Sequence, residues 1–279
     1  MSDSSYQFKL GDYDVLMLKD LSMERQAAGF LPDAQPEEIE RIVRLGGQDP
    51  NALRWAFTPI LFRGSGHTIL IDTGLGGERG RLAALLPENG IQPSAIDTII
   101  ITHGHGDHVG GIFDASGSFI YPNAHYVFWQ SEWDYWTADE RFSGANPQPG
   151  KETWERLKAH PDLIKTVGGA GMDEAEIMPG ICAVASPGHT IGHISVEVTS
   201  GGQKWLHIAD AAHNWFQMQC PQYSPMFDYD RQQSAESRKR MFERAARDGS
   251  LMTAYHFPFP GAGYVRTAGN QLVWDQVGK

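Results

Sequence analysis

The strongest constraint on the fold is an apolar run that ends abruptly in a cluster of polar side chains. Residues 96–103 read IDTIIITH, which is typical of a strand buried on both faces. The following residues, GHGDHVGG, add more imidazole and carboxylate groups directly after this run. Because ligands bind at the carboxyl ends of strands in open α/β sheets, we expect this cluster to lie at a binding edge.

The spacing within the cluster favours a metal site over an ordinary polar loop. His103 and His105 are two residues apart and can point the same way from an extended turn, whereas Asp107 and His108 are adjacent and must diverge. The glycines between them allow the backbone bends that such convergence needs. One short loop can therefore serve two neighbouring metals, since imidazole and carboxylate are ligands of zinc, iron and manganese. A polar loop without chemistry is the alternative.

Strand-like and helix-like patterns alternate along the chain. Runs of β-branched and aromatic residues predict strands, and apolar residues three or four apart predict helices. The predicted strands cover 14–20, 58–64, 67–74, 96–103, 124–129, 180–186, 193–200 and 204–210, and the predicted helices cover 36–45, 78–90, 130–142, 150–164 and 231–249. Segments 20–57 and 214–232 fit this rhythm less well. The pattern predicts an α/β protein, and with no linker or repeat we expect one domain over residues 1–279.

The charge and the apolar pattern argue against two classes of partner. The 279 residues include 34 acidic and 23 basic side chains, a formal charge of −11, so the average surface repels nucleic acid. We find no signal peptide and no uninterrupted apolar window of about 18 residues, which favours a cytoplasmic protein that does not bind membranes. Cys182 and Cys220 lack C-x-x-C spacing and are expected to be free thiols.

Five ordered motifs resemble those of the metallo-β-lactamase-fold hydrolases. After DTG at 72–74 and the histidine cluster come SPGHTIGH at 186–193, HIADAAH at 207–213 and AYHFPFPG at 254–261. The resemblance spans residues 58–266. It implies an α/β fold built as a four-layer αβ/βα sandwich with a dinuclear metal site.

The resemblance also implies a set of metal ligands. His103, His105 and His189 would hold one divalent ion, Asp107, His108 and His256 would hold the other, and Asp210 would bridge the two. Zinc is the first expectation, although iron, manganese and cobalt suit the same ligands. Asp72 would orient a ligand histidine, and His193 would support its own turn rather than bind metal.

The implied reaction is hydrolysis by a hydroxide that bridges the metals. Asp107 faces this nucleophile and is expected to handle the proton passed to the leaving group. The sequence around HFPFPGAGYV, the aromatic segment 214–232 and the helix after it resemble the branch that contains methyl parathion hydrolase and lactonase-like relatives. This branch implies a homodimer. The substrate is then expected to be a small, largely apolar ester or lactone, with side activity on organophosphate triesters.

One residue departs from a related pattern. The acyl-homoserine lactonases carry tyrosine three residues after the bridging aspartate, whereas this chain has His213. A neutral imidazole can also donate a hydrogen bond to a carbonyl, so we predict a catalytic role for His213, with a turn cap or a solvent-facing side chain as the alternative. The candidate pocket aromatics are Trp133, Trp136, Trp215, Phe216 and Phe257, although core packing is the alternative for each.

Other functions remain open at this point. A thioester hydrolase resembling glyoxalase II or a phosphodiester hydrolase would suit the same ligands, and a non-catalytic metal-binding protein is a third alternative. No arginine cluster is identified that would hold a phosphate dianion, so we expect neutral substrates to be preferred.

Overall fold

Two seven-stranded mixed sheets form the centre of the protein. The structure is a computed structural model that describes residues 4–138, 150–269 and 271–278. The first sheet has the order β1 (Ser5–Leu10), β2 (Tyr13–Leu18), β5 (Ile60–Gly64), β6 (His67–Ile71), β7 (Thr98–Ile100), β8 (His125–Trp129) and β9 (Ile164–Val167). The second has the order β10 (Glu174–Met178), β11 (Ile181–Ala185), β12 (Ile194–Ser200), β13 (Gln203–His207), β14 (Leu251–Thr253), β15 (Ala262–Ala268) and β16 (Gln271–Gln276). A separate antiparallel pair is formed by β3 (Leu21–Arg25) and β4 (Leu53–Phe57).

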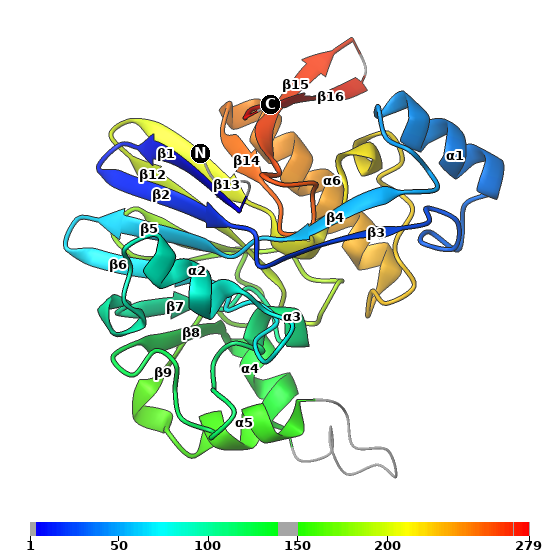
Figure 1. The fold of residues 1–279 in the computed structure, drawn as a ribbon. Helices are drawn as coiled ribbons and strands as arrows, with labels where there is room; N and C mark the ends of the chain where they lie inside the picture. The colour runs from blue at the N-terminus through cyan, green and yellow to red at the C-terminus, as the bar shows by residue number, and fades with distance from the viewer. Residues whose placement is uncertain (1–3, 139–149, 270, 279) are drawn as a thin grey trace.

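The helices lie outside the sheets (Figure 1). They are α1 (Pro36–Leu45), α2 (Leu82–Glu88), α3 (Gly106–Val109), α4 (Gln130–Thr137), α5 (Lys151–Lys158) and α6 (Arg231–Asp248). Short 3-10 turns are η1 (Pro93–Ala95), η3 (Pro161–Leu163), η4 (Ala209–Ala211) and η5 (Trp215–Met218). The predicted helix 130–142 ends at Thr137 in the structure, and residues 139–142 lie outside the described ones.

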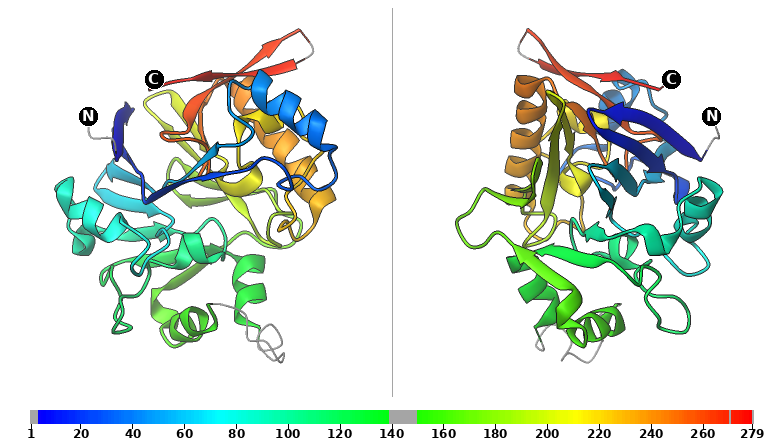
Figure 2. Two further views of the ribbon diagram at one scale, coloured as in Figure 1. Left: turned by 45° about the vertical axis from the view of Figure 1, so that its right-hand side comes forward. Right: turned by 90° about the vertical axis from the view of Figure 1, so that its left-hand side faces the viewer.

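The layers follow from strands that are apolar on both faces. In and after β7, the side chain of Ile100 packs between the two sheets, while Ile99 and Ile101 pack against the helical layer of α2, α4 and α5. On the second sheet, Leu206 and Met252 pack against Phe242 of α6. Figure 2 shows α6 on one flank and α2 on the other, with the sheets between them. The predicted four-layer αβ/βα sandwich is therefore confirmed.

The sheet topology brings polar residues from distant segments to one edge. Strands β6, β7 and β8 are parallel, so the residues that follow each of them lie at the same edge. These residues are the DTG motif, the histidine cluster and the start of α4. In the second sheet, β13 and β14 are also parallel, and their carboxyl ends lead to Asp210 and His256.

Segment 20–57, which lacked a clear pattern, forms β3, α1 and β4. Apolar residues of this segment form a separate buried cluster, in which Ile42 of α1 and Trp55 of β4 pack with Phe216. Within the ranges described above, no helix is long and apolar enough to cross a membrane. Both cysteines are free, as expected.

Candidate metal centre

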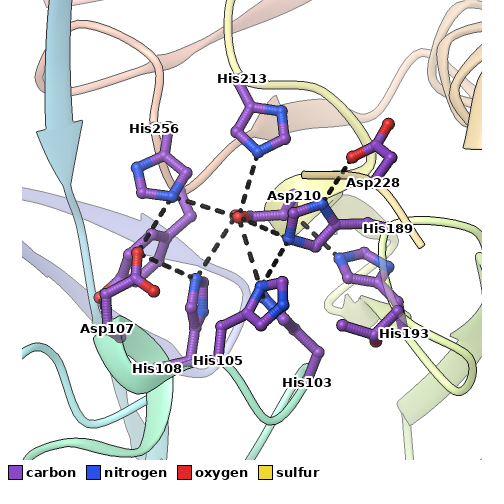
Figure 3. Close-up of polar contacts among 12 residues, drawn as sticks. His103, His105, Asp107, His108, His189, His193, Asp210, His213, Asp228 and His256 are labelled. Carbon is purple, nitrogen blue, oxygen red and sulfur yellow. Dashed lines mark hydrogen bonds and ion pairs between the residues drawn. The ribbon is translucent and has the colours of Figure 1, made fainter. Parts of the chain in front are cut away.

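Asp210 lies at the centre of a ring of histidines (Figure 3). Its carboxylate oxygens are 3.1 Å from His256 Nε2, 3.3 Å from His189 Nε2 and 3.5 Å from His108 Nε2. The side chain of Asp210 is buried in η4, just after β13. A central carboxylate with imidazole nitrogens on several sides is the arrangement expected of a ligand shared by two metals.

Three imidazoles converge on one side of Asp210. His103 Nε2 lies 3.1 Å from His105 Nδ1, and His105 Nδ1 lies 2.9 Å from His189 Nε2. The first two residues follow β7, and the third comes from the loop between β11 and β12. Their ligand atoms all lie within 4.8 Å of one another, which is close enough for one ion.

Asp107, His108 and His256 form a second group with the same spread of ligand atoms. His256 Nε2 is 3.3 Å from the Asp107 carboxylate, and His108 Nε2 is 3.6 Å from it. The first two residues lie in α3, whose short helical turn separates their side chains, and the third follows β14. The sequence-predicted ligands are thus all brought together. Two of the candidate groups correspond to the division that the resemblance implies, and two further groups cut across it: His103, His108 and Asp210, and His189, Asp210 and His213.

The buried polar atoms of this cluster suit divalent cations. His108 Nε2 and Asp210 Oδ1 are buried and have no hydrogen-bond partner among the described residues. Burial alone would lower the pKa of His189 and of His256, but the neighbouring carboxylates raise each pKa to about 9. The carboxylates therefore favour positive charge next to His189 and His256, whereas burial lowers the pKa of His105 to about 3. The nitrogen and oxygen donors of the cluster match zinc or iron. The ligand assignment itself stays a prediction.

Neighbouring residues fix the orientation of the candidate ligands. Asp72 Oδ2 lies 2.8 Å from His108 Nδ1, as the resemblance led us to expect, so that the Nε2 atom faces the cluster. His193 Nε2 accepts the backbone N–H of Asp210 at 3.1 Å, which agrees with the supporting role expected for it. Tyr255 donates its hydroxyl hydrogen to the carbonyl oxygen of Asp107 at 2.6 Å.

Asp228 is a site residue that the sequence analysis missed. Its Oδ1 atom lies 2.8 Å from His189 Nδ1, and its side chain is buried. The Arg238 guanidinium lies 3.3 Å from its other oxygen. Burial would raise the pKa of Asp228, but His189 and Arg238 lower it to about 2. The available signal was a pair of carboxylates, Asp228 and Asp230, in the aromatic segment 214–232, which is too weak to identify a partner.

Asp228→Asn should weaken metal binding, because it replaces a charged acceptor of the His189 ring hydrogen by a neutral amide. We expect the affinity for one ion to fall by roughly tenfold to a hundredfold, the range for residues that support a metal ligand. Competition titration with a chromophoric chelator measures this. Asp230→Asn is the control, since Asp230 caps α6 and Asn caps equally well. Equal affinities for the wild type and Asp228→Asn would contradict the assignment.

His213 points into the cluster and not toward solvent. Its side chain is buried, its Nε2 atom lies 3.3 Å from Asp210 Oδ2, and its ring stacks on His256 with centroids 5.3 Å apart. Neither ring nitrogen has a hydrogen-bond partner within the described part of the chain. The nearby turn is capped instead by Asn214 and Gln217. The alternative of a turn cap or a solvent-facing side chain is therefore wrong.

A pocket of about 480 Å³ opens onto the cluster. Its lining comes from the metal loops, from β3 and β4, from the DTG loop and from segment 214–232: Arg25, Trp55, Phe57, Leu75, Arg79, His105, Gly106, Asp107, His189, Asp210, His213, Phe227 and His256. A second pocket of about 190 Å³ shares Arg25, Trp55 and Phe227 with it and continues to Phe30. Segment 214–232 thus contributes one wall, through Phe227.

The aromatic residues predicted to line the pocket do not line it. The structure places them in or against the apolar clusters: Trp133, Trp136, Trp215, Phe216 and Phe257. The helices and loops that carry them turn these rings toward the sheets or toward α1, where they bury more apolar area than a solvent-filled pocket would allow. The aromatic walls come instead from Trp55, Phe57 and Phe227.

Comparisons with known proteins agree with this fold. The dizinc quorum-quenching lactonase AidC has a TM-score of 0.86 at 24% identity, with 99% of this chain and 98% of that chain covered. The hydrolase AbOPH of the beta lactamase superfamily has a TM-score of 0.84 at 26% identity, with 100% and 99% covered.

The sequence relatives match over shorter stretches. Ribonuclease Z of Aeropyrum pernix is 35% identical over 71 residues, which is 25% of this chain and 21% of that protein. The chain therefore spans less than two thirds of this relative. The model of the Metallo-beta-lactamase superfamily matches residues 58–248. Because this match covers more than half of the chain and the two sheets have the corresponding fold, the protein belongs to the metallo-beta-lactamase superfamily.

Proposed function

We propose that this protein is a dinuclear metal-dependent hydrolase of a small, largely apolar ester or lactone, with side activity on organophosphate triesters. One observation carries the proposal: Asp210 lies between two groups of ligand atoms, 3.3 Å from His189 and 3.1 Å from His256, at a pocket whose walls are aromatic. Two cations held there would activate water and polarise the substrate oxygen. AidC, a dizinc lactonase, and AbOPH, a hydrolase, are similar in fold and support this reaction class.

The residues around the pocket have distinct roles in this proposal. The Asp107 carboxylate borders the pocket and is partly exposed, with 22% of its side chain accessible, so it can pass a proton to a leaving group. Trp55 and Phe57 pack their rings against His256 and exclude water from one side of the cluster. Phe227 offers an apolar surface to the substrate on the opposite wall.

Charged residues of the same pocket bear on which substrate charge it selects. Contrary to the sequence expectation, two arginines line it: Arg25, whose guanidinium lies 5.1 Å from the Trp55 ring, and Arg79. Both arginines are exposed, whereas Asp210 is buried. We therefore still propose a neutral scissile group. A phosphodiester hydrolase is the second candidate, favoured by these arginines and by the short match to ribonuclease Z.

A panel of substrates on metal-analysed protein tests the proposal. We expect about two ions per chain, turnover that is lost on chelation and restored by added metal, and a higher kcat/KM for lactones and aryl esters than for thioesters or bis-aryl phosphodiesters. A phosphodiester that is the best substrate by a wide margin would replace the ester proposal by the second candidate. No turnover of any ester by protein that holds its metal would favour a non-catalytic metal-binding role.

Sedimentation tests the homodimer that the resemblance implies.

A further inference from the structure

Glu132 is a buried carboxylate that joins two of the metal loops. It lies in the first turn of α4, which follows β8 at the edge where the site forms (Figure 1). Its Oε1 atom accepts hydrogen bonds from the backbone N–H of Gly104 at 2.8 Å and from Trp136 Nε1 at 2.7 Å. Its Oε2 atom accepts from the Thr190 hydroxyl and from the backbone N–H of Gly192, both at 2.8 Å.

The two oxygens contact different parts of the candidate metal centre. Gly104 lies between His103 and His105, and Thr190 directly follows His189. The two loops that supply these imidazoles meet at the contact between His105 and His189, which are 84 residues apart in the sequence. Glu132 therefore bridges the two loops that carry all three candidate ligands of one ion. It makes none of its hydrogen bonds to the loop of His256.

The glycines of both motifs are explained by the close approach of α4. A Cβ atom on Gly104 would lie 2.3 Å from Trp136 Nε1, and one on Gly192 would lie 2.3 Å from the Glu132 backbone nitrogen. No side chain fits at either position unless the helix moves away. The first turn of α4 is thus packed against both loops as well as bonded to them.

Burying the Glu132 carboxylate costs free energy of desolvation. Glu132 has no exposed surface, and burial raises its pKa although its four donors oppose the shift. Replacing a buried ion by an apolar side chain is often neutral or stabilising, so a buried carboxylate suits a role in specifying the structure of the two loops better than a role in stability. Its oxygens each accept two hydrogen bonds, which uses the lone pairs available in the carboxylate plane. Glu132 therefore acts on the protein and is not itself a metal ligand.

We propose that Glu132 is a positioning residue that sets the metal affinity of the His103, His105 and His189 group, and not that of the Asp107, His108 and His256 group. The inference rests on the proposed metal centre. The carboxylate holds the two loops together before an ion binds. Because the loops then lose less conformational entropy on binding, the affinity for the ion rises.

Glu132→Gln is the variant that tests this role with little change in shape. An amide offers one acceptor oxygen, and its NH₂ group must face either Gly104 and Trp136 or Gly192 and Thr190. The hydroxyl of Thr190 can rotate to accept, but a backbone N–H cannot. At least one loop therefore loses its hydrogen bond, and we expect about a tenfold or larger fall in affinity for one of two ions, the range for residues that support ligands.

Tyr255→Phe is the matched control. It removes the hydrogen bond to the Asp107 carbonyl and leaves the ring packed on His108, with centroids 4.0 Å apart. It should weaken the other ion. The experiment measures stepwise zinc affinities of both variants by chelator competition, and then repeats Glu132→Gln in the backgrounds His105→Ala and His256→Ala. The effect of Glu132→Gln should persist in His256→Ala and vanish in His105→Ala.

The outcomes separate this inference from the proposed function. Wild-type protein that binds no zinc would overturn the metal centre and with it both proposals. Unchanged affinities in Glu132→Gln, or an equal loss for both ions with a lower Tm of the metal-free protein, would overturn the positioning role alone. If Glu132→Gln does not fold, Thr190→Val tests the positioning role instead, because it removes one of the four hydrogen-bond donors to Glu132 and keeps the carboxylate. Its affinity for one ion should fall, and an unchanged value would contradict the inference.

Discussion

Asp210→Ala is expected to lower kcat/KM by more than about 100-fold, beyond the range for residues that only support a ligand. The Asp210 carboxylate is within 3.8 Å of a nitrogen of each of five histidines: His103, His108, His189, His213 and His256. In the proposed centre, its removal would take one ligand from both ions at once and leave the charge of the cations less compensated. Elemental analysis of the purified variant should show fewer than two ions per chain, together with the kinetic loss.

The matched control is Asp275→Ala, which removes a surface aspartate paired with Arg266 at 2.9 Å on β16. This variant should keep its metal and its activity, because exposed ion pairs contribute little to stability. An Asp210→Ala protein that retains two ions and its full rate would contradict the shared-ligand assignment. Loss of one ion alone would restrict Asp210 to a single metal.

His213→Ala is expected to lower kcat by roughly tenfold to a thousandfold while the metal content stays intact, the range for losing one hydrogen bond to a developing oxyanion. Burial lowers the pKa of His213 to about 4, although Asp210 opposes the shift. The imidazole is then neutral at pH 7 and carries one N–H donor at the pocket wall. Steady-state kinetics on the best ester of the panel, with metal analysis of the same sample, measures the effect.

Each other result for His213→Ala has its own meaning. His189, Asp210 and His213 also form a group whose ligand atoms lie close enough to hold an ion, so the loss of one metal would make His213 a ligand. A change confined to KM would make it a binding residue. His160→Ala serves as the control, because this exposed histidine packs on Phe119 away from the cluster. Kinetics equal to those of the control would remove His213 from the mechanism.

Local sequence patterns predicted the elements whose own residues decide their structure. Helix α1 follows from the apolar spacing of Ile39, Ile42 and Val43, and α6 ends at Asp248, directly before Gly249, whose left-handed backbone favours glycine. Strands such as β3, with the sequence LSMER, were missed because they are short and carry charged residues. Their strand structure depends on a partner strand.

The candidate metal ligands could also be proposed from the sequence, because each lies in a motif that follows a strand. The parallel pairs β6–β7 and β13–β14 bring the ends of neighbouring strands together, whereas His189 follows the antiparallel strand β11. The superfamily followed from the same motifs. The tertiary structure alone decided which side chains support and surround them: Glu132 and Asp228 around His189, and Trp55 and the two arginines in the pocket. The contacts of Asp228 with His189 and of Glu132 with Thr190 join residues that are 39 and 58 positions apart in the sequence, and they depend on how helices and loops pack onto the finished sheets. The spacing of residues along the chain specifies backbone conformation over one or two turns, whereas contacts of this kind are specified by packing that no local pattern contains.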